Sequence, residues 1–436
     1  MNNTPHNNVT PIRPEPRILS RQEHNISRDN ISESALKVLY RLKNAGFEAY
    51  LVGGSVRDLL LGREPKDFDV VTSATPEQVR ELFRNSRVIG RRFKLVHVRF
   101  NNEIIEVSTF RTAHHIADGE GHVVDGTIIR DNVYGTIDDD VWRRDLSVNA
   151  LFYNIKDFSV IDYVGGLDDI RAGRIRLIGD PEKRYIEDPV RLLRVVRFAT
   201  KLGFRIDKPT EEALTRHTDL LDKIPPARLF EETLKLFLGG CALQTFEQLR
   251  HYGLFSALFP QTEEALSREE GGFPHMLLIR ALENTDKRLG ADMSVTPGFL
   301  LAAMLWAPMQ EVYRDNLAKG MSDKEAMFLA GDIVISRQIA NLAIPRRFTK
   351  MAREIWQFQS RLTRTRGKQP ARTMANPRFR AAYDFLLLRA QAGENVSQLV
   401  DFWTGLQNGE HGETIKEGKP SMPRNRRKRR PRTHRS

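Results

Sequence analysis

In the first 110 residues, hydrophobic positions follow a helical spacing in some segments and form short runs of strand length in others. From Ser32 to Ala45, leucines at helical spacing are followed by a glycine, which predicts an amphipathic helix with a glycine stop. Shorter apolar runs of four to seven residues have strand length, and two of them are separated by a pair of asparagines, as in a hairpin. The further elements expected here are a helix at 55–61 and strands at 47–52, 66–71, 96–100 and 104–110.

The pattern changes after about residue 170, where long helical periodicities replace the strand signals. We therefore expect a mixed α/β domain at 26–170 and an all-helical remainder that extends to about 405. Within that remainder we separate a neck at 171–240 from a body at 241–405. The first 25 residues are polar and contain four prolines, which predicts a disordered lead-in rather than a signal peptide or membrane span. Residues 406–436 are expected to form a disordered basic tail.

Charge and cysteine content narrow the class of protein. The chain of 436 residues carries a formal charge of +12 and a single cysteine, Cys241, which excludes disulfides and cysteine-based zinc sites. Nine Lys and Arg and no acid lie from Lys419 to Ser436, so residues 1–418 carry only +12 − 9 = +3. Such a tail suits a polyanion such as RNA, although a merely solubilising tail is the alternative. A reducing, cytoplasmic setting is expected.

Two carboxylates on a predicted strand are the sharpest chemical signal. Asp67 and Asp69 lie two residues apart, so a strand would direct both to one face and direct Phe68 to the core. Adjacent carboxylates repel each other unless a cation lies between them, and Mg²⁺ bridges protein carboxylates to substrate phosphates. This pair therefore predicts a Mg²⁺ site for phosphoryl or nucleotidyl transfer. A solvated strand face is the ordinary alternative.

A glycine turn precedes these carboxylates and completes the pattern. Gly53 and Gly54 stand at the start of the predicted helix, where bare backbone and the helix N-terminus favour phosphate oxygens. Arg57, one turn further on, is expected to add a charge contact. Each feature alone is common, but the order strand, Gly-Gly, helix, strand and Asp-x-Asp favours a nucleotide-binding site over coincidence.

Four motifs in order carry a family resemblance. They are GGSVRDLLLG at 53–62 with DFDV at 67–70, IEVSTFR at 105–111, RRDLSVNAL at 143–151 and EDPVRLLRVVRF at 187–198. The chain from about Ser27 to beyond Phe230 resembles the nucleotidyltransferase superfamily, in the branch of bacterial poly(A) polymerases and CCA-adding tRNA nucleotidyltransferases. Weaker similarity extends to about Arg389. Ser55 departs from the family, which commonly has glycine there; its small hydroxyl could donate to phosphate.

The resemblance implies a fold and a set of roles. The fold would be an α/β head domain like that of polymerase β, followed by an all-helical neck and body. Either Glu106 or Asp145 would be the third catalytic carboxylate beside the aspartate pair, and both stay candidates. The remaining implied nucleotide contacts are Arg144 and Asn149 to sugar and phosphate, and Asp188, Arg191 and Arg194, which fall broadly on one side of a helix, to the base.

Features outside the shared motifs favour poly(A) polymerase within this branch. VIGRRFKLVHV at 88–98 and IPPARLFEE at 224–232 resemble the polymerases, as does the basic extension. Between Arg346 and Arg380 there are eleven Lys and Arg and one acid, Glu354, with aromatics interleaved, so sequence-independent RNA binding is expected. Most of those aromatics are expected in helix cores. The candidate RNA-binding residues are Arg346, Arg347, Arg361, Arg364, Arg427 and Arg430.

The resulting hypothesis is a monomeric, Mg²⁺-dependent enzyme that adds AMP from ATP to RNA 3′ ends. The alternatives are a CCA-adding enzyme and a non-catalytic RNA-binding protein on a transferase scaffold. Protein partners cannot be predicted from the sequence. A metal site at His114, His115 and His122 is not expected, because their segment lacks a recognisable ligand spacing.

Overall fold

The computed structural model describes residues 15–90, 94–101, 103–112, 123–124, 127–128, 133–268 and 276–409. It forms two compact units. The N-terminal unit comprises Met1–Pro260 with Asn341–Ala343, and the C-terminal unit comprises Gln261–Ala340 with Ile344–Ser436. Within the described residues, no helix is long and apolar enough to cross a membrane.

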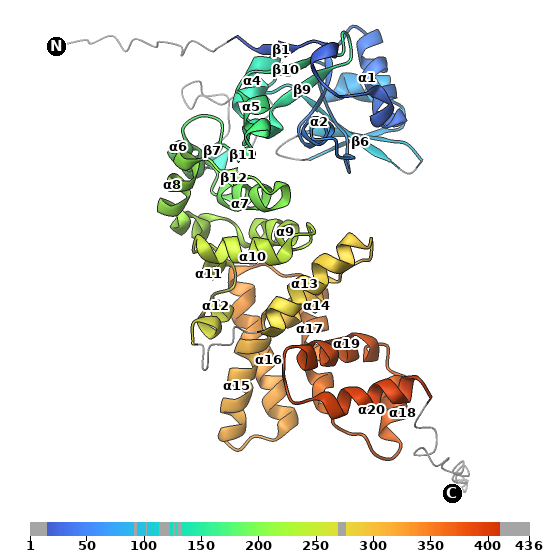
Figure 1. Ribbon diagram of the computed structural model, residues 1–436, viewed down its shortest axis with the longest axis vertical. Helices are drawn as coiled ribbons and strands as arrows, with labels where there is room; N and C mark the ends of the chain where they lie inside the picture. The colour runs from blue at the N-terminus through green and yellow to red at the C-terminus, as the bar shows by residue number, and fades with distance from the viewer. Residues whose placement is uncertain are drawn as a thin grey trace, which may run out of the picture. The chain divides into compact units, whose positions relative to one another are not determined.

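An eight-stranded sheet, built from residues between Arg17 and Asp162, forms the first part of the N-terminal unit (Figure 1). All neighbouring strands are antiparallel except β3 and β6, which pair in parallel. Parallel neighbours need a crossover connection, and here it runs through a helix and two further strands. The strands, in spatial order, are β1 (Arg17–Leu19), β10 (Val160–Asp162), β9 (Leu151–Asn154), β2 (Ala49–Val52), β3 (Asp69–Thr72), β6 (Ile104–Thr109), β5 (Leu95–Arg99) and β4 (Ser86–Ile89).

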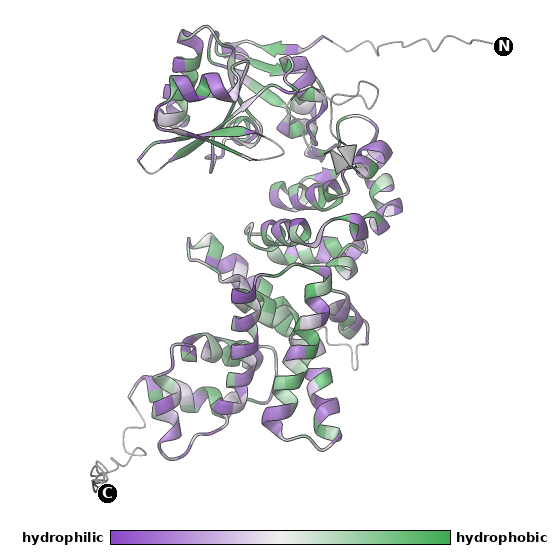
Figure 2. Cartoon of the chain, turned by 180° about the vertical axis from the view of Figure 1, so that it is seen from behind, coloured by the Kyte–Doolittle hydropathy of each residue, from purple (hydrophilic) through white to green (hydrophobic). Residues whose placement is uncertain are grey.

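Each face of the sheet has its own apolar cluster. Leu51 and Val70 point to one face, where they pack with the helices α1 (Glu33–Asn44), α2 (Gly54–Leu60) and α3 (Pro76–Leu82). Their strand neighbours Tyr50 and Val71 point to the other face, near α4 (Ile137–Trp142). The alternation follows from the two-residue period of a strand. Figure 2 shows the strands coloured largely as hydrophobic and the helices in mixed colours, as expected for elements with one buried side.

The rest of the N-terminal unit is mainly helical. Helix α7 (Val190–Leu202) is its longest and packs against α9 and α10. The other elements are η1 (Arg21–Glu23), η2 (Arg28–Asn30), β7 (Val123–Val124), β8 (Thr127–Ile128), η3 (Ser147–Asn149), α5 (Gly166–Arg171), β11 (Arg174–Ile175), α6 (Pro181–Glu187), β12 (Arg205–Ile206), α8 (Lys208–Arg216), η4 (Thr218–Lys223), α9 (Pro226–Phe237), α10 (Ala242–His251) and α11 (Phe255–Leu258).

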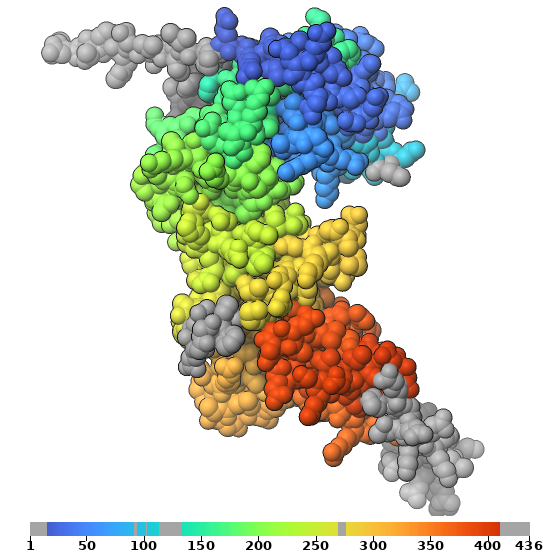
Figure 3. Space-filling view, in the orientation of Figure 1, coloured from blue at the N-terminus to red at the C-terminus, as the bar shows by residue number. Residues whose placement is uncertain are grey.

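The C-terminal unit is helical throughout its described part. Its apolar centre includes the fully buried Trp356 and Trp403, whose indole N–H groups donate to the backbone oxygens of Ala302 and Leu362. In the space-filling view residues 369–409, drawn in red, form one continuous lobe (Figure 3). Its helices are α12 (Pro260–Ser267), α13 (Met276–Gly290), α14 (Pro297–Met304), α15 (Trp306–Ala318), α16 (Asp323–Asn341), α17 (Arg346–Leu362), α18 (Gln369–Met374), α19 (Phe379–Gln391) and α20 (Ser397–Gln407).

The predicted α/β head followed by a helical remainder is confirmed, with three local corrections. Part of the expected disordered lead-in forms β1, which pairs with β10 and buries Leu19. The strand expected at 66–71 begins only at Asp69, so Asp67 precedes it. The remainder also contains a short parallel pair, β11 with β12, because two-residue strands carry too little pattern to be seen in the sequence.

A buried polar loop holds the segment before β9 in place. Asp162, at the end of β10, accepts the backbone N–H groups of residues 164–167 at 2.9–3.0 Å. Asp169, fully buried on α5, accepts the Ser147 hydroxyl at 2.6 Å and also pairs with Arg174 and Arg176. Buried carboxylates need such partners to offset their lost hydration. The network therefore fixes η3, which carries the predicted site residue Asn149.

Gly166 makes this arrangement possible, and Gly166→Ala tests it. A Cβ at this position would lie 2.3 Å from the Ser147 carbonyl oxygen, so the backbone would have to move. We expect a loss of about 1–3 kcal/mol in unfolding free energy in urea, the range for overpacking. The control is Gly290→Ala on α13, where a Cβ meets nothing within 4 Å and the change should be neutral or stabilising. Equal stability of the two variants would contradict the close approach.

Candidate active site

Two of the predicted carboxylates lie side by side because of strand register. In the parallel pairing of β3 with β6, Asp69 is aligned with Glu106. Both residues alternate with core residues, Val70 and Ile105, so they point to the same face of the sheet. His97 on β5 lies on the other side of Glu106, with its Nε2 atom 3.6 Å from Oε2. Glu106 is thus on an interior strand next to the aspartate pair.

The electrostatics of Asp69 reflect this crowding. Loss of hydration and the negative charge of Glu106 raise the pKa of Asp69 to about 6, with a further contribution from Asp67 and opposition from Arg144. The Asp69 residue is nevertheless exposed, so a cation or substrate can reach it. A carboxylate whose negative charge is disfavoured in an open site is typical of functional positions.

The glycine turn lies where the sequence placed it, at the start of α2. Gly53 precedes the helix with φ of 77° and ψ of −134°, a conformation that favours glycine. Ser55, expected as a possible phosphate donor, instead is buried and donates its hydroxyl to the Val52 carbonyl at 3.1 Å. The backbone of Gly53 and Gly54 remains the part of this turn that suits phosphate.

The Arg57 side chain is bound to partners within the protein. Its side chain is only 2% exposed and pairs with Asp58 at 2.7 Å, while its Nη1 atom donates to the Asn149 side-chain oxygen. The ring of Phe198 lies 5.5 Å from the guanidinium. The contact of Arg57 with a triphosphate stays a prediction, and in this conformation Arg57 is bonded to Asn149. The sequence pattern could not distinguish an inward from an outward arginine on so short a helix.

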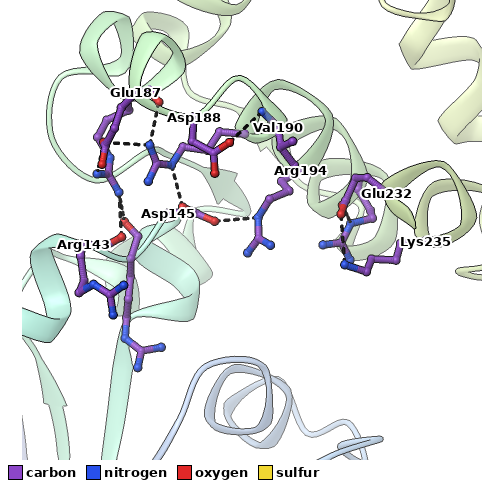
Figure 4. Close-up of polar contacts among 12 residues, drawn as sticks. Arg143, Asp145, Glu187, Asp188, Val190, Arg194, Glu232 and Lys235 are labelled. Carbon is purple, nitrogen blue, oxygen red and sulfur yellow. Dashed lines mark hydrogen bonds and ion pairs between the residues drawn. The ribbon is translucent and has the colours of Figure 1, made fainter. Parts of the chain in front are cut away.

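Asp145 is held between two arginines of α7, Arg191 and Arg194 (Figure 4). Its oxygens lie 2.7 Å from Arg191 Nε and 2.7 Å from Arg194 Nε. Burial would raise the pKa of Asp145, but Arg194 and Arg191 outweigh burial and lower the pKa. Among the open alternatives for a third acid, the geometry therefore favours Glu106, and Asp145 connects the segment before η3 to α7.

The three residues predicted to contact the base differ in their solvent exposure and in how many bonds they already make within the protein. Arg191 is 6% exposed and also donates to Glu187 and to the Arg184 carbonyl, so it is committed to the fold. Arg194 is more open, with a side chain that is 32% exposed. Asp188 lies before α7, where it accepts the Val190 N–H and an Arg228 N–H at 2.7 Å.

A pocket of about 350 Å³ collects several predicted residues. Arg144 reaches it while bound to Asp140 through Nε at 2.9 Å and Nη2 at 2.6 Å. Asp140 was missed in the sequence, although its position four residues before Arg144 on a helix was the available signal. The lining residues that the sequence had predicted are Glu106, Arg144, Asp145, Asn149 and Arg194, joined by Ser108, Arg111, Asp140 and Arg143.

The carboxylates of the site can be compared with the ligands that a metal ion requires. In the part of the chain that the structure describes, no three His, Cys, Asp or Glu residues come together as a complete protein site. This excludes a closed structural site there but suits Mg²⁺, which uses one or two carboxylates and takes its other ligands from water and substrate phosphates. The segment with His114, His115 and His122, where no metal site is expected, lies outside the described residues.

The candidate RNA-binding arginines lie in the C-terminal unit. Arg346 and Arg347 begin α17, whereas Arg361 and Arg364 lie at its other end, about 22 Å away along the axis. All four are exposed. The aromatics Trp356, Phe358 and Phe379 are core residues, as expected. Arg427 and Arg430, like residues 91–93 of the polymerase-like segment, lie outside the described residues.

Taken together, the sheet carboxylates, the glycine turn and the arginine-lined pocket define a nucleotidyltransferase. Family models match three parts of the chain: "Poly A polymerase head domain" at 49–176, "Probable RNA and SrmB- binding site of polymerase A" at 203–266 and "Polymerase A arginine-rich C-terminus" at 319–436. The chain belongs to the poly(A) polymerase family.

Curated relatives support that membership over most of the chain. Poly(A) polymerase I of Escherichia coli O6:H1 is 50% identical over 408 residues, covering 91% of this chain and 86% of the relative. The Salmonella typhimurium protein of the same name is 49% identical over 402 residues, with the same coverage. The CCA-adding enzyme of Lactobacillus helveticus is 41% identical over 215 residues, but this covers only 49% of the chain. The predicted enzyme class is thereby confirmed, and CCA-adding enzymes are distant relatives.

Solved structures share the fold. The Bacillus stearothermophilus CCA-adding enzyme in complex with CTP is similar with a TM-score of 0.57 and 25% identity, covering 87% of this chain and 84% of its own. A tRNA nucleotidyltransferase solved with a primer tRNA and an incoming ATP analog has a TM-score of 0.57 at 22% identity, covering 85% and 99%. Nucleotidyltransferases of this kind use a divalent metal.

The raised pKa of Asp69 predicts a stability effect with a definite sign. Because the folded pKa of about 6 exceeds the ordinary value of 3.8, ionised Asp69 opposes folding above pH 6, and this effect disappears toward pH 4. We expect Asp69→Asn to raise the unfolding free energy by about 1 kcal/mol at pH 8 in EDTA, after allowance for solvent screening. The gain should be the same when urea unfolding is repeated at pH 7, and it should shrink at pH 6 and further at pH 5. A gain independent of pH would contradict the proposed repulsion.

Proposed function

We propose that this chain transfers AMP from ATP to RNA 3′ hydroxyl groups by in-line attack on the α-phosphate, without a template. The observation that carries the proposal is the parallel register that aligns Asp69 with Glu106 on the face of the sheet that carries Arg144. Negative side chains that would hold a cation thus lie close to positive side chains that would hold phosphates. This is the charge arrangement that nucleotidyl transfer requires.

The proposed metal ligands are Asp67 and Asp69, with Glu106 as the third acid. Mg²⁺ is the fitting ion because all the donors are carboxylate oxygens; when bound, it would neutralise phosphate charge and lower the pKa of the attacking hydroxyl. Glu106 and Asp69 keep this position negative, and Arg144 limits their mutual repulsion. His97 orients Glu106 from the neighbouring strand.

The nucleotide would be held by groups with distinct roles. The Gly53 and Gly54 backbone would receive the triphosphate, and Arg144 with Asn149 the sugar and phosphate. Arg57 would act through Asn149, to which it is bonded. Asp188 and Arg194 would read the base, while Arg191 would fix Arg194 indirectly through their shared partner Asp145.

RNA would be bound mainly through charge. Exposed arginines on the C-terminal unit and the basic tail, including Arg427 and Arg430, suit a sequence-independent backbone contact. We further propose that the protein acts as a cytoplasmic monomer. Reversible, salt-sensitive binding is what an enzyme acting on many RNA ends needs.

Replacing either aspartate tests the proposed chemistry. We expect Asp67→Ala and Asp69→Ala to lower the rate of AMP addition at least about a thousandfold, because a site that neutralises transition-state charge is removed. The assay offers each nucleoside triphosphate separately, with Mg²⁺ and a labelled unstructured RNA. RNA affinity should stay unchanged. The control is Glu81→Ala, an exposed acid on α3 in the same unit, which should keep full activity.

Two results would contradict the proposal. Normal elongation by either aspartate variant would exclude the carboxylates from the reaction. Addition of C and then A to a trimmed tRNA by the wild type, with no ATP ladder on unstructured RNA, would favour the CCA-adding alternative instead.

Arg194→Ala tests base reading. The variant removes the more exposed of the two arginines on Asp145, so we expect KM for ATP to rise about ten- to a hundredfold, the effect of removing one or two charge-assisted hydrogen bonds. Discrimination between ATP and CTP in kcat/KM should fall, while RNA affinity is kept. Arg205→Ala, an exposed arginine on β12, is the control. An unchanged ATP-to-CTP ratio would remove Arg194 from base recognition.

A further inference from the structure

A second basic pocket lies in the C-terminal unit, on residues that the proposed chemistry does not use. It is formed where α17 ends and α18 follows, and has a volume of about 190 Å³. Its lining includes three arginines, two amide side chains and one ring: Arg361, Arg364, Arg372, Gln369, Asn376 and Phe358.

The three pocket arginines differ from other arginines nearby in how their charge is balanced. Arg353 pairs with Asp332, Arg378 with Glu354, and Arg380 with Asp384. Within the described residues, by contrast, the side chains of the pocket arginines make no ion pair and no hydrogen bond. Three positive charges around one cavity repel one another, and that repulsion is relieved when an anion enters.

The pocket is built on a fixed base. Phe358 and Leu362 of α17 belong to the buried cluster around Trp403, and Pro370 of α18 is also buried. The chain reverses at Gly367, whose φ of 67° favours glycine, and this turn returns Arg372 to the end of α17. The Arg361 guanidinium lies 4.9 Å from the Phe358 ring centroid, which restrains its direction. The arginines are therefore pre-positioned by the core.

The chemistry of the lining selects the kind of anion. Guanidinium groups match the tetrahedral oxygens of phosphate with paired N–H donors. The Asn376 side-chain oxygen accepts the Arg378 N–H at 2.9 Å, which leaves its amide N–H groups as further donors. The volume is several times the roughly 30 Å³ of a water molecule but below the roughly 300 Å³ at which pockets begin to enclose whole ligands. A single phosphate group fits these limits better than a complete nucleotide.

We propose that Arg361, Arg364 and Arg372 form a phosphodiester-binding site for single-stranded RNA, separate from the catalytic pocket. The proposal rests on the proposed function for the identity of the polyanion. Since the pocket belongs to a different unit and shares no lining residue with the catalytic pocket, it contributes to RNA affinity and not to bond formation. At this site one RNA phosphate would be bound by three particular arginines, in addition to the general attraction of RNA to the basic surface.

The test compares two charge-matched triple variants of the full chain. One carries R361Q, R364Q and R372Q; the control carries R314Q, R337Q and K319Q, which removes three exposed positive side chains of the same unit outside the pocket. Binding of a labelled 20-nucleotide unstructured RNA is measured by fluorescence anisotropy in EDTA, without ATP, over a salt series. We expect the pocket variant to weaken binding about tenfold and to reduce the log–log salt slope by about 0.7, because one phosphate is no longer neutralised. The control should change affinity less than about twofold.

Further arms separate the possible outcomes. Replacing the same three arginines by lysine keeps the positive charge but removes the paired N–H donors, so we expect a partial loss of RNA affinity. Circular dichroism verifies that each variant is folded. In AMP addition, the pocket variant should raise the KM for RNA about tenfold, whereas the charge-matched control should change that KM less than about twofold. If the wild type bound RNA through these arginines but added no AMP, the pocket would stand and the proposed function alone would fail.

Three results would contradict the proposal that this pocket binds an RNA phosphate. Equal weakening by both triple variants would mean that only total charge matters. Unchanged RNA affinity in the pocket variant would exclude RNA as its ligand. The same variant losing affinity for a poly-glutamate peptide, with RNA binding intact, would assign the arginines to an acidic protein segment instead.

Discussion

The parallel pairing of β3 with β6 is the constraint on which the catalytic site depends. It aligns Asp69 with Glu106, and both point to the same face of the sheet. The register is set by apolar residues on the opposite face, because a shift of one residue would expose Val70 and Val107 and bury the carboxylates. Hydrophobic burial therefore holds two negative charges closer than they would stay on their own. The raised pKa of Asp69 is the electrostatic consequence.

Arginines on the neighbouring elements compensate for this concentration of negative charge, and they do so at fixed positions. Asp140 holds Arg144, and Asp145 holds Arg191 and Arg194, so each cation has a direction before any substrate arrives. Asp169, through Ser147, fixes the short helix that carries Asn149. Buried ion pairs of this kind contribute little net stability, because desolvation offsets their attraction. Their value here is preorganisation, which is what electrostatic stabilisation of a transition state requires.

The helices and turns of the site could be predicted from the sequence, but the contacts between segments that are far apart in the chain could not. The helix capped by Ser32, the turn at Gly53 and the start of α7 after Pro189 depend on neighbouring residues, and all three were predictable. The adjacency of Asp69 and Glu106 depends on a register between strands 37 residues apart, which no local pattern encodes. For the same reason Arg57 and Arg191 were expected to touch the nucleotide, although both are buried. Arg57 is bonded to Asn149, 92 residues away, and Arg191 to Asp145, 46 residues away, so the inward direction of each depends on a residue far along the chain.

Pairing with an acidic residue separates the arginines that hold the fold together from the arginines that are available to bind RNA. An arginine bound to an acid, such as Arg191 or Arg378, has at least one donor occupied by a carboxylate, which also opposes its charge. It can orient a neighbour, but it contributes little to attracting a polyanion. The pocket arginines of the C-terminal unit keep both charge and donors, at positions fixed by a buried aromatic core. Counting Lys and Arg overestimates the RNA-binding surface, because only cations without acidic partners release counterions when phosphate binds.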